Sequence, residues 1–196
     1  MIERAAQAIR QGKVVLYPTD TLYGLGCDPF NEEALRRLFA IKGRSEKKGV
    51  LLLIQDYSYA EVVSNHIPNL FYELVKAFWP GPVTFLLEGN SSCSRLLLGE
   101  DGKVGLRHPD LVFLQLWMAA IPGPIVSTSA NVSGQPLAAL EGLKQLFDHQ
   151  VDLILEGRER EQPSQPSTVV DLTIDPPRIV RAGRWASRVE EFLTRR

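Results

Sequence analysis

The chain has 196 residues, of which 44% are hydrophobic and 23% charged, values typical of a globular protein rather than of a disordered or fibrous chain. This length predicts one domain, spanning 1–196, with a sizeable core. The 22 basic and 23 acidic residues give a net charge of −1, which excludes a chain-wide positive field that would attract nucleic acid, so any anion site must be local.

Hydrophobic periodicity predicts an α/β fold. The first residues, Met1–Arg4, lack the apolar core of a signal peptide, and no run approaches the roughly 18 apolar residues of a membrane helix, so a cytoplasmic protein without membrane contact is expected. Helical spacing predicts helices at 2–11, 32–41, 57–65, 69–78, 110–120, 140–147 and 187–194. Short apolar runs predict strands at 14–17, 50–54, 83–87, 104–106, 124–127, 153–155, 168–172 and 178–181. Asn31 and Asp110 are predicted N-caps.

The order of these elements predicts a twisted, mixed open sheet flanked by helices. Alternating helices and strands are typical of parallel strand pairs. The last two strands, however, are separated only by a proline-rich turn at 175–177, which is too short for a parallel connection. The sheet is therefore expected to contain both parallel and antiparallel pairs.

Hydroxyl side chains and glycines follow the first predicted strand. Pro18 ends this strand because proline has no N–H to donate to a sheet. Thr19, Thr21, Gly24 and Gly26 come soon after it, and glycine permits backbone turns that other residues resist. The segment is predicted to be a polar loop at a strand end.

A basic segment lies beyond the second predicted helix. Residues 42–48 contain four cations, among them Lys42, Arg44 and Lys48. A basic run alone is usually an exposed turn that the helix dipole favours. The glycines between these cations indicate close approach to an anion instead.

The segment 124–134 is the most polar strand end of the chain. Ile125 and Val126 predict a short buried strand, which opens into a tight loop with four hydroxyl side chains and Asn131. A buried hydroxyl or amide without a partner costs about 1–3 kcal/mol. The loop therefore either caps a helix or binds an oxygen-rich ligand such as a phosphate or a carboxylate.

Two further predicted strands end in a cation, Arg107 in one case and Arg181 in the other. Polar loops at strand ends of an α/β sheet point to a ligand crevice at the ends of neighbouring strands. With these arginines added, the sequence predicts a concave cationic crevice.

These segments resemble the YrdC-like threonylcarbamoyl-AMP synthases. Pro-Thr-Asp-Thr-Leu-Tyr-Gly-Leu-Gly-Cys-Asp at 18–28 is similar to the family's opening motif. Lys42-Gly43-Arg44 and Ser129-Ala130-Asn131 are similar to its Lys-x-Arg and Ser-x-Asn signature. Further similar segments are 79–84, 105–107, 166–171 and 181–183, in family order. The short bacterial TsaC type is most similar, because longer relatives carry an extra C-terminal domain.

The resemblance implies a YrdC-like fold and a nucleotidyltransferase. The reaction it implies joins L-threonine, bicarbonate and ATP into threonylcarbamoyl-AMP and pyrophosphate, for the N6-threonylcarbamoyladenosine modification of tRNA position 37. The attacking carbamate oxygen is already anionic, so this step needs positioning and neutralisation of phosphate charge rather than a general base. Implied partners are the downstream tRNA threonylcarbamoyl-transfer proteins, while contact between tRNA and this chain is compatible with the reaction but not required.

The resemblance also implies the site residues. Those expected at the ATP are Lys42, Arg44, Lys48, Asn131 and Arg181. Those expected at threonine or its carbamate are Thr21, Arg107, Ser129 and Ser167, with Arg107 pairing the amino-acid carboxylate. The expected catalytic set is Lys42, Arg44, Ser129 and Asn131. Mg²⁺ is expected to arrive on the triphosphate, because the sequence offers no carboxylate cage for a metal.

The chain departs from the family at two positions. Many relatives carry a histidine that contacts threonine where this chain has Leu53. Lys48 stands where relatives have an asparagine that contacts ATP, which keeps a donor and adds a charge. How the threonine end is held is therefore open.

Two other functions are open from the sequence. A non-enzymatic RNA-binding module could use the same crevice, although the net charge and the lack of aromatic residues within 42–48 argue against it. A different acyl-adenylate or carbamoyl transferase is the other alternative. Cys27 is predicted to be a small buried thiol, because the sequence places no activating base beside it.

Overall fold

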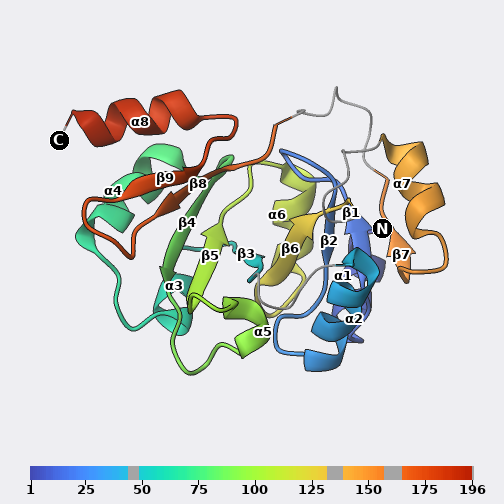
Figure 1. Ribbon diagram of the computed structural model, residues 1–196. Coiled ribbons are helices and arrows are strands. Elements are labelled where there is room, and N and C mark those ends of the chain that lie inside the picture. Colours follow the sequence, from blue (N-terminus) through green and yellow to red (C-terminus); the bar gives the residue numbers. More distant parts are fainter. Residues whose placement is uncertain (44–48, 132–138, 157–164, 196) are drawn as a thin grey trace.

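The computed structural model describes residues 1–43, 49–131, 139–156 and 165–195, so the predicted site residues Arg44 and Lys48 lie outside the described part (Figure 1). The described residues form eight helices and nine strands. The helices are α1 (Ile2–Arg10), α2 (Glu32–Lys42), α3 (Tyr59–Val63), α4 (Asn69–Phe78), α5 (Arg95–Leu98), α6 (Val112–Ala119), α7 (Leu140–Phe147) and α8 (Ala186–Thr194). The strands are β1 (Val15–Tyr17), β2 (Gly24–Gly26), β3 (Leu51–Leu53), β4 (Val83–Glu88), β5 (Lys103–Arg107), β6 (Ile125–Ser129), β7 (Leu153–Ile154), β8 (Thr168–Asp171) and β9 (Arg178–Arg181).

The predicted α/β class and the mixed sheet are confirmed. The strands form one sheet in the order β7-β1-β2-β6-β3-β5-β4-β8-β9, with helices around it (Figure 1). The pairs β1–β7, β3–β5 and β4–β8 are parallel, and the other five are antiparallel. The last two strands pair antiparallel, as their short connection predicts.

Every predicted helix and strand is present, but α5 and β2 were not predicted. Helix α5 is a single turn, too short to show periodicity. Strand β2 reads Gly-Leu-Gly, and glycine disfavours strands. A side chain does not fit at Gly26, because a Cβ there would lie 2.4 Å from the Val126 carbonyl oxygen and 2.7 Å from the Tyr17 ring. Close packing between β1 and β6 therefore requires this glycine.

The polar loop predicted after the strand at 124–127 is wrong over residues 128–129. Strand β6 continues to Ser129, because β2 pairs with it through Gly24–Ser129 and Leu25–Thr128. Strand β2, which was not predicted, thus extends β6 by pairing with its last residues. The hydroxyls of this segment are held on a sheet rather than on a loop.

The two faces of the sheet carry different side chains. One face packs into the larger core cluster, with Leu52, Phe85, Leu106 and Val126 among its buried residues. The opposite face is covered beside β1 and β6 by α1 and α6, whose Trp117 belongs to a second buried cluster. Side chains alternate between faces along a strand, so the residues next to these core positions face the other way.

One of the two predicted helix caps is confirmed. The Asn31 side chain accepts a hydrogen bond of 3.0 Å from the Ala34 N–H at the start of α2. The cap at Asp110 is wrong, because Leu111 is extended and occupies the N-cap position of α6. Among the described residues, none of the helices is long and apolar enough to cross a membrane.

Candidate functional site

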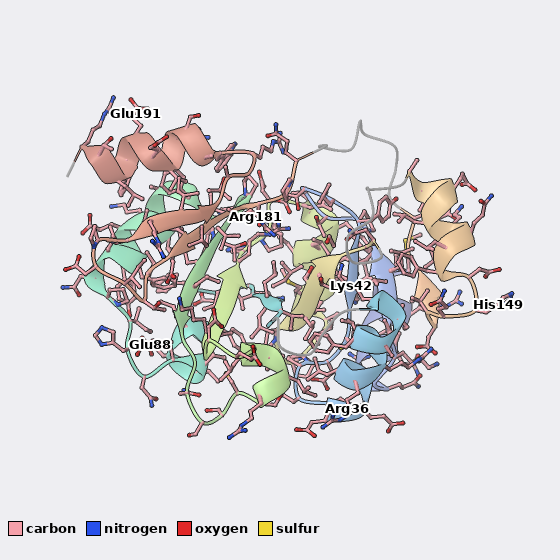
Figure 2. All side chains as sticks on the ribbon, viewed as in Figure 1. Arg36, Lys42, Glu88, His149, Arg181 and Glu191 are labelled. Carbon is pink, nitrogen blue, oxygen red and sulfur yellow. The ribbon has the colours of Figure 1, made fainter. Side chains whose placement is uncertain are left out.

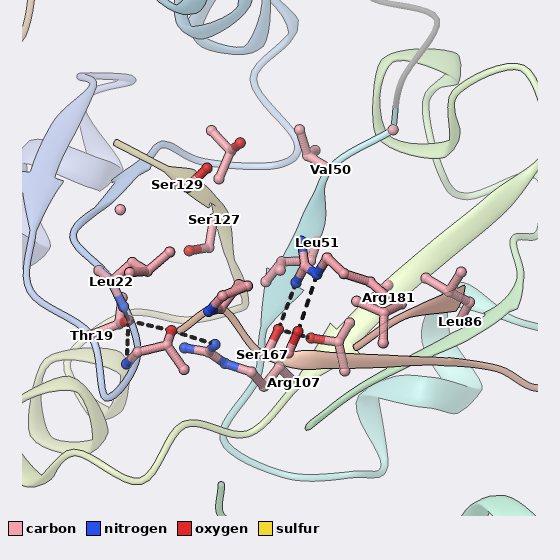
Figure 3. A pocket seen from close by; sticks show the side chains of 18 of the residues that line it. Thr19, Leu22, Val50, Leu51, Leu86, Arg107, Ser127, Ser129, Ser167 and Arg181 are labelled. Carbon is pink, nitrogen blue, oxygen red and sulfur yellow. Dashed lines mark hydrogen bonds between the residues drawn. The ribbon is translucent and has the colours of Figure 1, made fainter. Parts of the chain in front are cut away.

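A cavity of about 290 Å³ lies on the sheet face opposite the larger core. Residues from the β1–β2 connection and from β3, β4, β5, β6, β8 and β9 line it (Figure 3). On β5 the odd-numbered Lys103, Gly105 and Arg107 line the cavity, while Val104 and Leu106 point into the core. Because side chains alternate along a strand, β5 has a polar face that lines the cavity and an apolar face that packs into the core.

The cavity brings together segments that lie far apart in the sequence. Five predicted site residues line it: Thr21, Arg107, Ser129, Ser167 and Arg181. Lys42 and Asn131 do not line it but are hydrogen-bonded to Ser129, which does. The predicted meeting of the two polar strand ends is therefore confirmed for 18–26 and 124–131, while 132–134 lie outside the described residues.

Arg107 lines the cavity and forms a buried ion pair with Asp20. Its NH2 lies 2.8 Å from Asp20 Oδ1, and its NH1 donates to Thr21 Oγ1 at 2.9 Å. The side chains of Arg107 and Asp20 are only 4% and 6% exposed. Sequence reasoning placed Arg107 and Thr21 at the site but missed Asp20, although it lies within the same opening motif.

Ser167 and Arg181 form a second polar group in the cavity. Arg181 donates from NH2 to Ser167 Oγ at 2.9 Å and from Nε to the Ser167 carbonyl oxygen at 3.1 Å (Figure 3). Thr84 Oγ1 lies 2.9 Å from the same Ser167 hydroxyl. One residue expected at threonine and one expected at the nucleotide are therefore in direct contact.

Lys42 is a buried cation rather than part of an exposed basic turn. It is the last residue of α2 and only 3% exposed, because the helix runs further than predicted. Its ammonium contacts the Ser129 carbonyl and hydroxyl oxygens and, at 3.2 and 3.1 Å, the carbonyl and side-chain oxygens of Asn131. Arg36 of the same helix points outward, while Lys42 points toward β6 (Figure 2).

The Ser129–Asn131 turn is also held from within. The Ser129 hydroxyl donates to Asn131 Oδ1 at 2.7 Å, while that oxygen also accepts from Lys42. The Lys-x-Arg and Ser-x-Asn segments therefore meet at the end of β6, where one ammonium group fixes both signature residues of the turn.

A third cation, Lys103, lines the cavity and was missed by sequence reasoning. Its ammonium lies 2.7 Å from Asp171 Oδ2, whose side chain is 3% exposed. Burial raises the pKa of Asp171, but hydrogen bonds from Lys103 and Thr173 outweigh it and hold the pKa below its usual value. Alternation along 103–107 is the signal that could have placed Lys103 beside Arg107.

Apolar side chains complete the cavity wall, among them Leu22, Leu51 and Leu86. Leu53, which replaces the family histidine, is fully buried in the second core cluster and does not line the cavity. Leu22 is therefore placed to contact a ligand, whereas Leu53 is not.

The charge of the cavity wall is more balanced than a simple count of cations suggests. Arg107 is paired with Asp20 and Lys103 with Asp171, and the carboxylate of Asp101 also lines the wall. The cationic character of the crevice stays a prediction. In the described part of the chain no group of three or more His, Cys, Asp or Glu side chains is arranged to hold a metal ion.

Cys27 is fully buried, which confirms the prediction of a small core thiol. Burial raises the pKa of its thiol far above the usual value, with a smaller contribution from Asp28. A thiol in this state carries no thiolate at neutral pH and is unsuited to nucleophilic chemistry.

Comparison with known proteins identifies the family of this chain. The model of the Sua5/YciO/YrdC family, described as "Telomere recombination", matches residues 7–183. A threonylcarbamoyl-AMP synthase of Pseudomonas syringae pv. syringae is 37% identical over 186 residues, which cover 93% of this chain and 97% of that protein. A threonylcarbamoyl-AMP synthase of Coxiella burnetii is 34% identical over 157 residues, covering 80% of this chain and 84% of that one.

Two solved structures of similar fold bear the names Sua5 and YciO. P. abyssi Sua5 complexed with L-threonine superposes with a TM-score of 0.88 and 34% identity over 93% of this chain, which spans 54% of the Sua5 chain. E. coli YciO superposes with a TM-score of 0.83 and 34% identity over 93% of this chain and 88% of that one. The family model that matches most of the chain, and these relatives, show that the chain belongs to the Sua5/YciO/YrdC family.

Proposed function

We propose that this protein is an L-threonylcarbamoyladenylate synthase. In the proposed reaction, L-threonine and bicarbonate form threonine carbamate, whose oxygen attacks the α-phosphorus of ATP. A P–O bond to the carbamate forms, the bond to the β-phosphate oxygen breaks, and pyrophosphate leaves. Relatives named threonylcarbamoyl-AMP synthase that match most of the chain support this proposal.

The observation that carries the proposal is the shared wall of one cavity. Thr21 with Arg107, and Ser167 with Arg181, line the same cavity. Adenylate formation needs the carbamate oxygen, the α-phosphorus and the leaving oxygen of pyrophosphate held in line, while the amino-acid carboxylate is bound nearby. Hydroxyl donors and guanidinium groups on one face are suited to that task, and none of them needs to act as a base.

At the amino-acid end, Arg107 receives the carboxylate of threonine. Thr21 lies against Arg107, and Leu22 contributes apolar surface on the same wall. A guanidinium binds a carboxylate through two parallel N–H donors, which fixes the orientation of the ligand as well as its charge. Ser129 and Ser167, which line the same cavity, are assigned to threonine or its carbamate.

At the nucleotide end, Arg181 and Asn131 are assigned to ATP, together with Arg44 and Lys48 from outside the described residues. Lys42 donates hydrogen bonds to the side chains of Asn131 and Ser129 and holds them in place. Mg²⁺ enters with the triphosphate as part of the substrate. It neutralises phosphate charge as the pyrophosphate leaves.

The product is an activated acyl group that a later reaction must transfer to the adenosine at tRNA position 37. Downstream threonylcarbamoyl-transfer proteins are the proposed recipients. Direct contact between tRNA and this chain is not required. Because ATP, amino acid and tRNA meet in the cytoplasm, the reaction is placed there. No feature of the cavity specifically favours the RNA-binding alternative.

The purified protein is expected to release pyrophosphate when given L-threonine, bicarbonate, ATP and Mg²⁺, with no tRNA present. Omitting either threonine or bicarbonate removes the attacking carbamate, so the rate of pyrophosphate release should fall to the background that ATP gives alone. A coupled pyrophosphate assay, with the nucleotide product separated by chromatography, measures this. RNA binding without turnover, or pyrophosphate release indifferent to either co-substrate, would assign the protein to a different function.

The same assay is expected to rank amino acids as threonine above serine, with valine nearly inert. Threonine and serine differ by one methyl group, which is worth about 10- to 200-fold in an apolar pocket. Valine replaces the hydroxyl by a methyl, which leaves polar groups of the wall unpaired and costs more. The kcat/KM values for the three amino acids decide the question, and equal turnover of valine and serine would contradict the assignment of the threonine residues.

A further inference from the structure

Asp20 is separated from the cavity by the residue it contacts. It is not among the residues that line the cavity, while its neighbours Thr19 and Thr21 are. Its Oδ1 lies 2.8 Å from NH2 of Arg107, which does line the cavity. Asp20 therefore acts on the cavity only through another side chain.

A chain of hydrogen bonds fixes the second contact of Arg107. The Thr19 hydroxyl donates to the Leu22 carbonyl oxygen at 2.6 Å, so its one proton is used. The same oxygen accepts from the Thr21 and Leu22 backbone N–H groups at 3.0 and 3.1 Å, and in its 3.0 Å contact with the Thr21 hydroxyl the donor is Thr21. This leaves an oxygen lone pair of Thr21 for Arg107 NH1, at 2.9 Å. Two neighbouring groups of one loop thus hold two corners of the guanidinium.

The ion pair between Asp20 and Arg107 has unused hydrogen-bonding groups, which lowers its contribution to folding stability. Asp20 Oδ2 and Arg107 Nε are buried and have no hydrogen-bond partner among the described residues. A buried ion pair offsets its desolvation only when its remaining donors and acceptors are also bonded. A pair that leaves one group unbonded on each side contributes little to folding, so its presence at the cavity wall calls for a functional explanation.

We propose that Asp20 is a positioning residue that fixes the plane of the Arg107 guanidinium for the carboxylate of the amino-acid substrate. The inference rests on the proposed function, in which Arg107 binds that carboxylate. Two parallel N–H donors bind a carboxylate only when the guanidinium plane is correctly set. Asp20 also offsets part of the Arg107 charge, which alone would weaken anion binding. Orientation outweighs this effect, because a buried arginine without Asp20 would turn toward other acceptors.

Removing Asp20 is therefore expected to weaken threonine binding and leave ATP binding unchanged. Asp20→Ala should raise the Kd for L-threonine about 10- to 100-fold, as for loss of a hydrogen bond to a charged group. Asp20→Asn keeps an acceptor but loses the charge and should raise the Kd about 10-fold. Calorimetric titration with L-threonine and, separately, with ATP measures both affinities, and thermal unfolding verifies the fold. If Asp20→Ala does not fold, Asp20→Asn decides the question alone.

The control variants separate positioning from general damage. In an Arg107→Lys background, Asp20→Asn should no longer change the threonine Kd, because lysine has no planar fork for Asp20 to orient. Asp152→Ala removes the carboxylate from another arginine pair, with Arg37, outside the cavity, and should leave threonine affinity unchanged.

Each contrary result has a distinct meaning. Asp20 variants with unchanged or tighter threonine binding overturn the positioning role, as does an equal loss of ATP affinity. If the wild-type protein is active and the Asp20 variants bind threonine with the wild-type affinity, only the positioning role is overturned and the proposed function is retained. A wild-type protein that binds no threonine would overturn both.

Discussion

Replacing Lys42 by methionine is expected to lower the rate of threonylcarbamoyl-AMP formation by about 100-fold or more, the scale seen when one donor is removed from a preorganised polar site. Methionine keeps the length of the side chain but removes all three N–H donors. Four oxygens of Ser129 and Asn131 would lose the ammonium that holds them. Since the two residues are assigned to different substrates, the affinities for threonine and for ATP should both fall.

The matched control is Lys76→Met. Lys76, like Lys42, lies in the last turn of its helix, but it is exposed on α4. Its replacement removes a similar helix-dipole interaction and should leave both affinities and the rate unchanged. If Lys42→Met weakens ATP binding alone, Lys42 contacts the phosphates directly rather than supporting the turn. If neither affinity changes, both roles are wrong.

The sequence was sufficient for the elements that carry their own periodic signal. Helix α4 was predicted with both ends correct, because its apolar residues repeat at helical spacing through to Phe78. Strand β2 was not, because two of its three residues are glycines. What makes it a strand is pairing with β1 and β6, which lie before and long after it in the chain. Local patterns do not record such a requirement.

The site residues also divide into those that local sequence patterns predicted and those that they did not. The residues that meet at the cavity were predicted because hydroxyls and arginines follow apolar runs, and because their motifs resemble a known family. The burial of Lys42 was not predicted. The sequence placed the end of the helix one residue before it, and a cation beyond a helix end is expected to be exposed. Asp20 and Lys103 were missed because their roles depend on partners 87 and 68 positions away, Arg107 and Asp171. Pairing at such separations follows from sheet register, which short patterns do not encode.

Replacing Arg107 by lysine is expected to raise the Kd for L-threonine by about 100-fold or more, although the positive charge is retained. Arg107 lines the cavity, and its guanidinium donates to Thr21 and Asp20. An ammonium on a flexible stem cannot make a bidentate bond to a carboxylate while holding both contacts. Lysine keeps Asp20 paired with a cation, so the fold should survive where Arg107→Met alone would leave a buried carboxylate unpaired.

Titration with L-threonine, with ATP, and with both together measures the effect of Arg107→Lys. ATP affinity should change by less than about 3-fold, because Arg107 is assigned to the amino-acid carboxylate alone. Arg178→Lys is the control, an exposed arginine on β9 that does not line the cavity, and it should leave both affinities unchanged. A threonine Kd within about 5-fold of the wild type would mean that charge alone suffices at this position. In that case the fork geometry, and with it the orienting role of Thr21 and Asp20, would not govern how the amino acid is held.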